Sequence, residues 1–153
     1  MKLAEALILR ADIRKRIEQL RSRLAANIQV QEGSDPHEDP QALLEELPRL
    51  VREFTDLVKR INRTNAATPF EEGLTLTEAL AERDALAIER SVLTSAIQSV
   101  AQPVNRYMRS ELRSITTVNL GQLQKQADDL ARDYRELDTR IQAMNWAVEL
   151  IEE

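Results

Sequence analysis

The chain has 153 residues, the size of a single domain, and its formal charge of −5 argues against a domain built mainly to bind nucleic acid. Aromatic residues make up 3% of the chain and there are 3 glycines, too few for turn-rich sandwiches and barrels or for a doubly wound sheet. The chain contains no cysteine, so disulfides, thiolate nucleophiles and cysteine-based zinc sites are excluded.

Apolar residues recur with helical spacing in four segments, and this periodicity predicts four helices. The first covers about residues 2–30 and ends at a polar, acidic break. Asp39 is expected to cap the second helix, about 41–65, with Pro40 at its first position. Pro48 lies about two turns into this helix and predicts a kink or a later start.

The second half of the chain repeats this organisation. A break that contains Pro69 separates the second helix from a third, which is predicted over about 76–102. The segment 104–118 is rich in Ser, Thr and Arg and predicts either a short strand or an irregular loop. Asn119 is expected to cap the fourth helix, about 119–152.

These elements predict an all-α fold, a single helical-bundle domain over residues 1–153 with coiled-coil-like packing. Blocks of positive and negative charge alternate along the chain, so that arginines flank the apolar stripe of the first helix and aspartates flank that of the fourth. Complementary flanks of this kind select helix partners and their orientation.

Two arginines lie inside the apolar arc of the third predicted helix. Arg83 and Arg90 are one heptad apart, and a guanidinium that faces a bundle interior must be paired or must line a wet cavity. They either pair with carboxylates on a neighbouring helix, bind a small anion such as a carboxylate or phosphate, or lie at a subunit interface. Asn62 and Asn65, at the end of the second helix, either cap that helix or belong to the same polar site.

Second apolar patches lie opposite the main stripes of the first and last predicted helices. Ile8 belongs to the first patch, and Trp146 and Leu150 belong to the second. A helix with two apolar faces packs on both sides, so these residues predict an interface of a homo-oligomer. The alternative is that the 104–118 segment of the same subunit buries the second patch.

Motifs that carry known chemistry are missing from the sequence. There is no P-loop, nucleophile elbow, zinc-protease motif or dinucleotide fingerprint, and the single histidine lies in an acidic loop where it is expected to be solvated. We therefore predict no cofactor, no metal site and no nucleic-acid partner, and we assign no catalytic residue. A metal held by Glu78, Glu82 or Asp84 belongs only to the hydrolase alternative below.

The N-terminal stretch lacks the apolar core and cleavage site of a signal peptide. No segment approaches the roughly 18 uninterrupted apolar residues that a membrane helix needs. Together with the absence of cysteine, these observations predict a cytoplasmic protein without an integral membrane segment.

Five segments together carry a resemblance to a known family. In chain order they are MKLAEALILRAD, VQEGSDPHEDP, INRTN, LTLTEALAERD and LQKQADDLARDYRELDTRIQAMNW. By their order and spacing, the chain resembles the septicolysin-like family of small bacterial proteins. The resemblance implies an α-helical bacterial protein with no established reaction, and the family label implies a pore-forming haemolysin.

The leading prediction is a non-enzymatic protein that forms an oligomeric helical assembly or binds a partner. One alternative is a binder of small anionic ligands, or a metal-assisted hydrolase, at an arginine-lined cleft. The second alternative is the pore-forming lytic protein that the family label implies.

Overall fold

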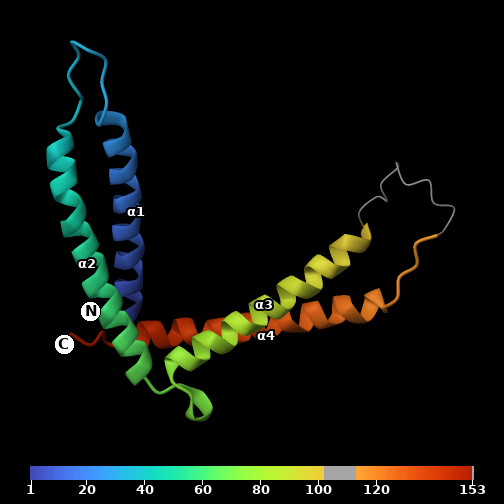
Figure 1. Cartoon of the computed structure of the whole chain (residues 1–153). Helices are drawn as coiled ribbons and strands as arrows, with labels where there is room; N and C mark the ends of the chain where they lie inside the picture. Colours follow the sequence, from blue (N-terminus) through green and yellow to red (C-terminus); the bar gives the residue numbers. More distant parts are fainter. Residues whose placement is uncertain (102–112, 153) are drawn as a thin grey trace. The chain divides into compact units, whose positions relative to one another are not determined.

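The computed structural model describes residues 1–101 and 113–152, and within these residues the regular structure is helical (Figure 1). Four α-helices follow one another, α1 (Leu3–Asn27), α2 (Pro40–Ala67), α3 (Leu76–Ala101) and α4 (Leu120–Ala147), with a short 3-10 turn, η1 (Glu71–Gly73), before α3. The helices pack against one another, which confirms the predicted all-α fold.

The chain forms two compact units. Unit 1 consists of Met1–Leu76 together with Gln142–Glu153, and unit 2 consists of Thr77–Ile141. Unit 1 therefore contains α1, α2 and the end of α4, whereas unit 2 contains most of α3 and the greater part of α4. A single domain over the whole chain and coiled-coil-like packing stay predictions.

α1 and α2 run side by side in unit 1, and their apolar stripes meet in its core (Figure 1). The core cluster joins six aliphatic side chains of the two helices: Leu20, Leu43 and Leu50, which are buried, and Ile17, Leu24 and Leu47, which pack against them. Each such side chain that leaves water stabilises the unit by about 1.5–3 kcal/mol. The core of unit 1 thus forms where the apolar stripes of α1 and α2 meet, and the periodicity of the sequence predicts both stripes.

The start of α2 has the predicted cap. The Asp39 carboxylate accepts a 3.0 Å hydrogen bond from the Gln41 N–H, and Pro40 is the first helical residue. The helix continues through Pro48, so the prediction of a later start is wrong. A proline removes one backbone hydrogen bond, and the burial of Leu43 and Leu50 on either side of it holds the helix together.

The connection from α1 to α2 is held by a polar cluster at its two ends. Arg23 donates hydrogen bonds from both Nε and Nη2 to the carboxylate of Glu38, the shortest at 2.6 Å. The buried Asn27 side chain donates to the Arg23 carbonyl and accepts from the Glu38 N–H. These bonds satisfy backbone groups at the end of α1, which ends at Asn27 rather than near residue 30 as predicted.

α4 ends at Ala147, five residues before the predicted end, because the chain beyond it pairs with the residues that precede α1. The Leu3 N–H donates to the Val148 carbonyl at 2.9 Å, and the Leu150 N–H donates to the Met1 carbonyl at 2.8 Å. The Lys2 ammonium also donates to the Ala147 carbonyl at the end of α4, where a cation is favourable. Extended pairing therefore takes the backbone groups that a longer helix would have used.

The same segment is fixed to α2 by Thr64. Its buried hydroxyl donates to the Arg60 carbonyl at 2.8 Å and accepts from the Ile151 N–H at 2.9 Å. Glu152 follows with a 2.6 Å bond from the Arg60 guanidinium. Residues 148–152 are thus a structural part of unit 1.

α3 and α4 form a helical pair in unit 2 (Figure 1). Asn119 caps α4 as predicted, because its side-chain oxygen accepts from the Gln122 N–H at 3.1 Å. Most of the predicted strand or loop over 104–118 lies outside the described residues, and residues 113–118 have no regular secondary structure.

Candidate functional site

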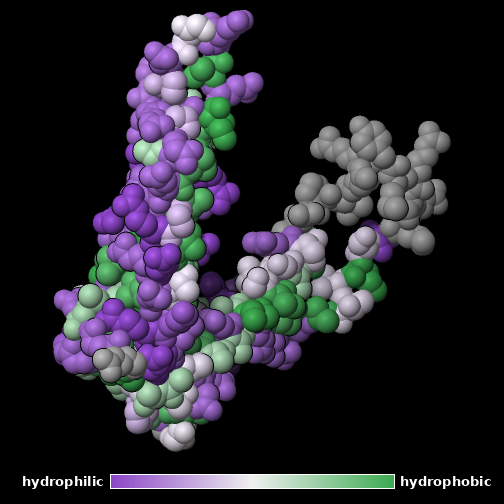
Figure 2. Space-filling view, turned by 60° about the vertical axis from the view of Figure 1, so that its left-hand side comes forward, coloured by the Kyte–Doolittle hydropathy of each residue, from purple (hydrophilic) through white to green (hydrophobic). Residues whose placement is uncertain are grey.

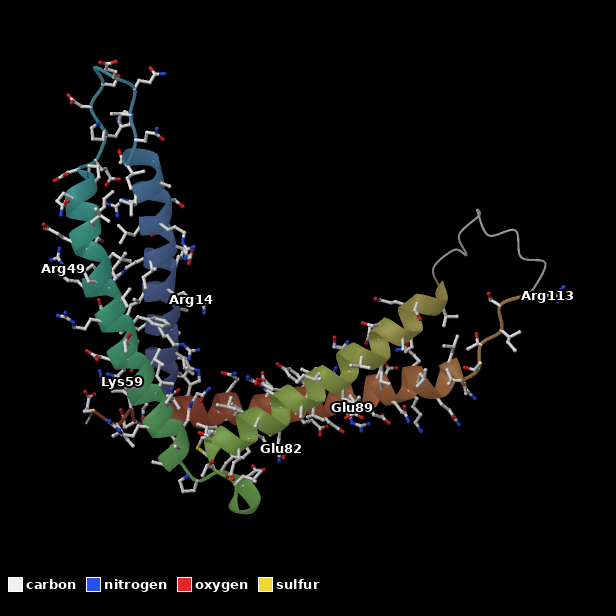
Figure 3. The ribbon with its side chains drawn as sticks, in the orientation of Figure 1. Arg14, Arg49, Lys59, Glu82, Glu89 and Arg113 are labelled. Atoms are coloured by element: carbon white, nitrogen blue, oxygen red, sulfur yellow. The ribbon has the colours of Figure 1, made fainter. Side chains whose placement is uncertain are left out.

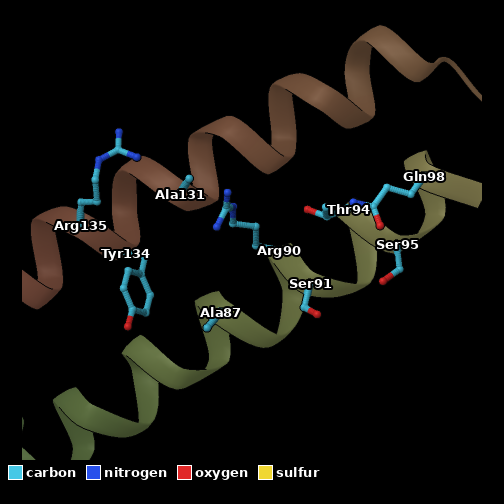
Figure 4. Close-up of a pocket in the computed structure, with 9 residues that line it drawn as sticks. All are labelled: Ala87, Arg90, Ser91, Thr94, Ser95, Gln98, Ala131, Tyr134 and Arg135. Carbon is cyan, nitrogen blue, oxygen red and sulfur yellow. The ribbon is translucent and has the colours of Figure 1, made fainter. Parts of the chain in front are cut away.

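A groove between α3 and α4 in unit 2 has a volume of 720 Å³ (Figure 4). We call it the α3–α4 groove. It is lined by nine residues of the two helices: Ala87, Arg90, Ser91, Thr94, Ser95, Gln98, Ala131, Tyr134 and Arg135. The lining combines two guanidiniums with hydroxyl and amide groups, and it contains no carboxylate.

The groove exists because small side chains lie where the helices face each other. Ala87 on α3 and Ala131 on α4 leave space that larger residues would fill. Arg90 extends from α3 toward α4 beside Ala131 (Figure 4). Residues three and four apart share one face of a helix, which is why one side of α3 supplies Ala87, Arg90 and Thr94 together.

The two groove arginines carry no ion pair within residues 1–101 and 113–152. Arg90 and Arg135 are both exposed, and neither guanidinium takes part in the salt bridges or side-chain hydrogen bonds of this part of the chain. The groove therefore presents two positive charges, one from each helix, and no carboxylate of the described residues pairs with either of them.

Arg83, one heptad before Arg90, has the opposite environment. Its Nη1 donates to Asp138 on α4 at 2.8 Å, and its Nη2 contacts Asp84 at 3.4 Å. The guanidinium also lies over the Tyr134 ring, 5.9 Å from its centre. Burial disfavours the charged form most strongly, but the hydrogen bonds and charges of Asp138, Tyr134 and Asp84 together outweigh it and raise the pKa of Arg83 above its ordinary value. This is the pairing with a neighbouring helix that the structural interpretation of Arg83 requires.

The four predicted ligand-binding residues are divided between the two units. Asn62 and Asn65 lie near the end of α2 in unit 1, exposed and half-buried respectively. Arg83 and Arg90 lie on α3 in unit 2, and Arg90 alone of the four lines the α3–α4 groove. Sequence reasoning did not identify Arg135 or Thr94, because their role depends on the register between α3 and α4.

Among the described residues, no group of three or more His, Asp or Glu side chains is placed to hold a metal ion. Glu78, Glu82 and Asp84 all lie on α3, and Asp84 contacts Arg83.

The residues predicted at an oligomer interface have different exposures. Ile8 is 55% exposed and Trp146 is 56% exposed, so both side chains are available for contact. Leu150 is only 4% exposed and lies in the core of unit 1, where its N–H pairs with Met1. Unit 1 also has an apolar groove of 390 Å³ along the α1–α2 pair, where hydrophobic side chains form a stripe (Figure 2).

A further apolar surface, which sequence reasoning missed, lies on the side of α3 away from its buried residues. We call it the α3 outer face, and it consists of five exposed side chains: Ala81, Ala85, Ile88, Val92 and Ala96. Ile88 is 66% exposed and Val92 is 63% exposed. Glu82 and Glu89 lie on α3 (Figure 3), at positions that flank this face by helical spacing, and no charged residue follows them from Ser91 to Ala101. This uncharged run is the feature of the sequence that could have indicated the α3 outer face.

These features define an all-α protein of two helical units with a polar groove. The family of unknown function DUF6847 matches residues 10–150, and the chain belongs to this family. The chain is 42% identical to a functionally unknown conserved protein from Corynebacterium diphtheriae whose crystal structure has a TM-score of 0.89 and covers 99% of both chains. No curated protein matches the chain.

The predicted septicolysin-like resemblance is wrong, because the matching family and the similar crystal structure carry no such link. Four of the five segments that suggested it lie wholly or mainly within α1, α2, α3 and α4, and amphipathic helices rich in Leu, Ala, Glu and Arg share such patterns without common descent. Within the described part of the chain, no helix is long and apolar enough to cross a membrane.

Proposed function

We propose that this protein functions as a self-assembling helical protein whose copies join through the α3 outer face. The observation that supports the proposal is the exposed apolar stripe of α3. One side of the helix packs on α4, and the other side exposes Ile88 and Val92. An apolar stripe along a helix is normally buried against another element.

The spacing of the α3 outer face fits a second helix. Its five residues follow intervals of four, three, four and four positions, which keeps them on one stripe. The stripe spans about 22 Å at 1.5 Å per residue. The alanines let a second helix approach closely, while Ile88 and Val92 supply the apolar area.

A second copy of the same helix complements this face. In an antiparallel contact with its two-fold axis near Ile88, Val92 of one copy lies opposite Ala85 of the other, and Ala81 lies opposite Ala96. Val92 then meets the small Ala85, Ile88 lies near Ile88 of the second copy, and the same patch serves both subunits, as a two-fold interface requires.

The test is the mass of the purified protein by light scattering over a range of micromolar concentrations. We expect an oligomer, and we expect Val92→Glu to raise its dissociation constant by about 100-fold, because the contact would bury an unpaired carboxylate. Ile28→Glu is the matched control, since Ile28 is 64% exposed but lies in unit 1. A monomeric wild-type protein would overturn the proposal.

A third variant separates the α3 outer face from the surface predicted at Ile8 and Trp146. Trp146→Gln should leave the oligomer intact. If Trp146→Gln dissociates the oligomer and Val92→Glu does not, the contact lies on unit 1 and the α3 proposal fails.

A further inference from the structure

We infer that the α3–α4 groove is a binding site for a small phosphate ester with a polar body, held by Arg90 and Arg135. This site is independent of the proposed assembly. It rests on an arginine–carboxylate pair between α3 and α4 that is not repeated one heptad further along.

The repeat becomes visible once the two helices are set in register. Arg83 on α3 faces Asp138 on α4, with 2.8 Å between Nη1 and the carboxylate. Because the helices run antiparallel, one heptad forward on α3 corresponds to one heptad back on α4 (Figure 1). Arg90 therefore occupies the position equivalent to Arg83, and Ala131 occupies the position equivalent to Asp138.

The sequence thus repeats the arginine but not its carboxylate. Opposite Arg83 the chain supplies the Asp138 carboxylate as a counter-ion. Opposite Arg90 it supplies only the methyl group of Ala131 and an open volume. Arg90 extends toward Ala131, so an anion in the groove would take the place that Asp138 has beside Arg83 (Figure 4). A planar guanidinium binds carboxylate and phosphate oxygens through two parallel hydrogen bonds.

The remaining lining residues indicate the class of anion. Arg135 adds a second positive charge from α4, which favours the two negative charges of a phosphate monoester over a single carboxylate. The hydroxyls of Ser91, Ser95 and half-buried Thr94 donate and accept hydrogen bonds, as a hydroxylated ligand requires. The groove, at 720 Å³, lies in the usual range for small-molecule sites and has room for more than the phosphate group.

A second groove, in unit 1, has the opposite lining. This 390 Å³ groove is formed mainly by Ile, Leu and Ala side chains, with Arg21 as its one charged residue. A 460 Å³ hollow of unit 1 contains two arginines, Arg10 and Arg14, but the rest of its lining, Ala11, Phe54 and Val58, has no hydroxyl or amide side chain. Of these three, the α3–α4 groove alone combines arginines with hydroxyl groups, which is why we place the phosphate ester there.

The proposal is tested by isothermal titration calorimetry with ribose 5-phosphate, and with ribose as the uncharged comparison. We expect wild-type protein to bind ribose 5-phosphate at least tenfold more tightly than ribose, with the affinity falling as salt is added. Arg90→Gln should lower the affinity for ribose 5-phosphate by about tenfold or more, because a charge-assisted hydrogen bond is lost.

Two further variants make the test specific. Ala131→Asp would restore the missing carboxylate, so it should abolish binding of ribose 5-phosphate and raise the melting temperature. Arg132→Gln removes the same charge from α4 outside the groove, where Arg132 pairs with Asp129 and Asp133, and should bind as wild type does. Equal affinity for ribose and ribose 5-phosphate, or unchanged binding in both Arg90→Gln and Ala131→Asp, would overturn the proposal.

Discussion

Units 1 and 2 both contain a pair of long helices, but the two pairs fill their seams differently. In unit 1, the stripes of α1 and α2 bring Leu20, Leu43 and Leu50 into a buried cluster. In unit 2, the side of α3 that faces α4 includes Arg83 and Arg90, and the leucines that the structure describes in this unit are half-buried: Leu80, Leu86, Leu93, Leu120, Leu123, Leu130 and Leu137. A helix interface filled with aliphatic side chains is stabilised by their burial. An interface that contains arginines instead leaves an open volume and positive charge that a ligand can occupy and neutralise.

The arginines of the two units show the same difference. Arg23 and Arg60 in unit 1 each bind a glutamate of the chain, Glu38 and Glu152, at 2.6 Å. In unit 2, the pairing of Arg83 is not repeated at Arg90. In unit 1, Arg23 and Arg60 therefore hold connecting segments of the chain in place. In unit 2, Arg90 stays available in the α3–α4 groove.

The largest expected difference between the units comes from truncating a leucine in each. Leu20→Ala in unit 1 should lower the free energy of unfolding by about 3 kcal/mol, because Leu20 is 2% exposed and a cavity would remain. Leu93→Ala in unit 2 should cost about 1 kcal/mol, because its half-buried side chain already contacts solvent. Urea unfolding followed by circular dichroism measures both, and equal costs would contradict the contrast between a filled and an open seam.

A smaller effect is expected from the ion pair between Arg83 and Asp138, which links the helices of unit 2. Asp138→Asn should destabilise the protein by about 1.5 kcal/mol, since it weakens a charge-assisted hydrogen bond to the half-buried Arg83. Asp133→Asn is the control, because its pair with Arg132 is exposed and should contribute less than about 0.5 kcal/mol. A double-mutant cycle with Arg83→Gln isolates the pair, and a coupling energy near zero would show that Asp138 acts in another way.

The smallest effect concerns the response of unit 1 to acid. Hydrogen bonds from Arg23 lower the pKa of Glu38 below its ordinary value of 4.5, and a hydrogen bond from Lys2 lowers that of Glu149. The folded state then binds fewer protons than the unfolded state, so this stabilisation is complete above about pH 4.5 and is lost as the pH falls through the folded pKa values.

Glu38→Gln should therefore lower the melting temperature at neutral pH and make it less dependent on pH in the acid range. Glu45→Gln, an exposed change on α2, serves as the control. An acid response of Glu38→Gln identical to that of wild type would mean that the bond from Arg23 does not hold the connection between α1 and α2.

Local signals were sufficient for the helices and for two of their caps. The apolar periodicity predicted four helices, and Asp39 and Asn119 cap α2 and α4 through hydrogen bonds to residues two or three positions away. The end of α4 could not be predicted in this way, because it depends on Lys2, 145 positions distant from Ala147. When contacts with residues distant in the sequence end a helix, the apolar periodicity of that helix does not show where it ends.

The candidate site was predicted only in part for a similar reason. Arg83 and Arg90 share a heptad position, so the sequence treats them alike. Their difference lies in Asp138 and Ala131 on another helix, and it appears only when the register of α3 against α4 is known. The α3 outer face was detectable, because the run from Ser91 to Ala101 contains no charged residue to mark a solvated side of that helix.

The pairing of Lys2 with Glu149 has a consequence for biosynthesis. The ribosome releases α1 and α2 before it has made unit 2, yet the Leu3 N–H finds its partner only at Val148, and the Thr64 hydroxyl accepts its hydrogen bond only from Ile151. Domains generally fold as units in the order of translation. Here unit 1 begins to form first, but these hydrogen bonds cannot form until residues 148–151 have been synthesised.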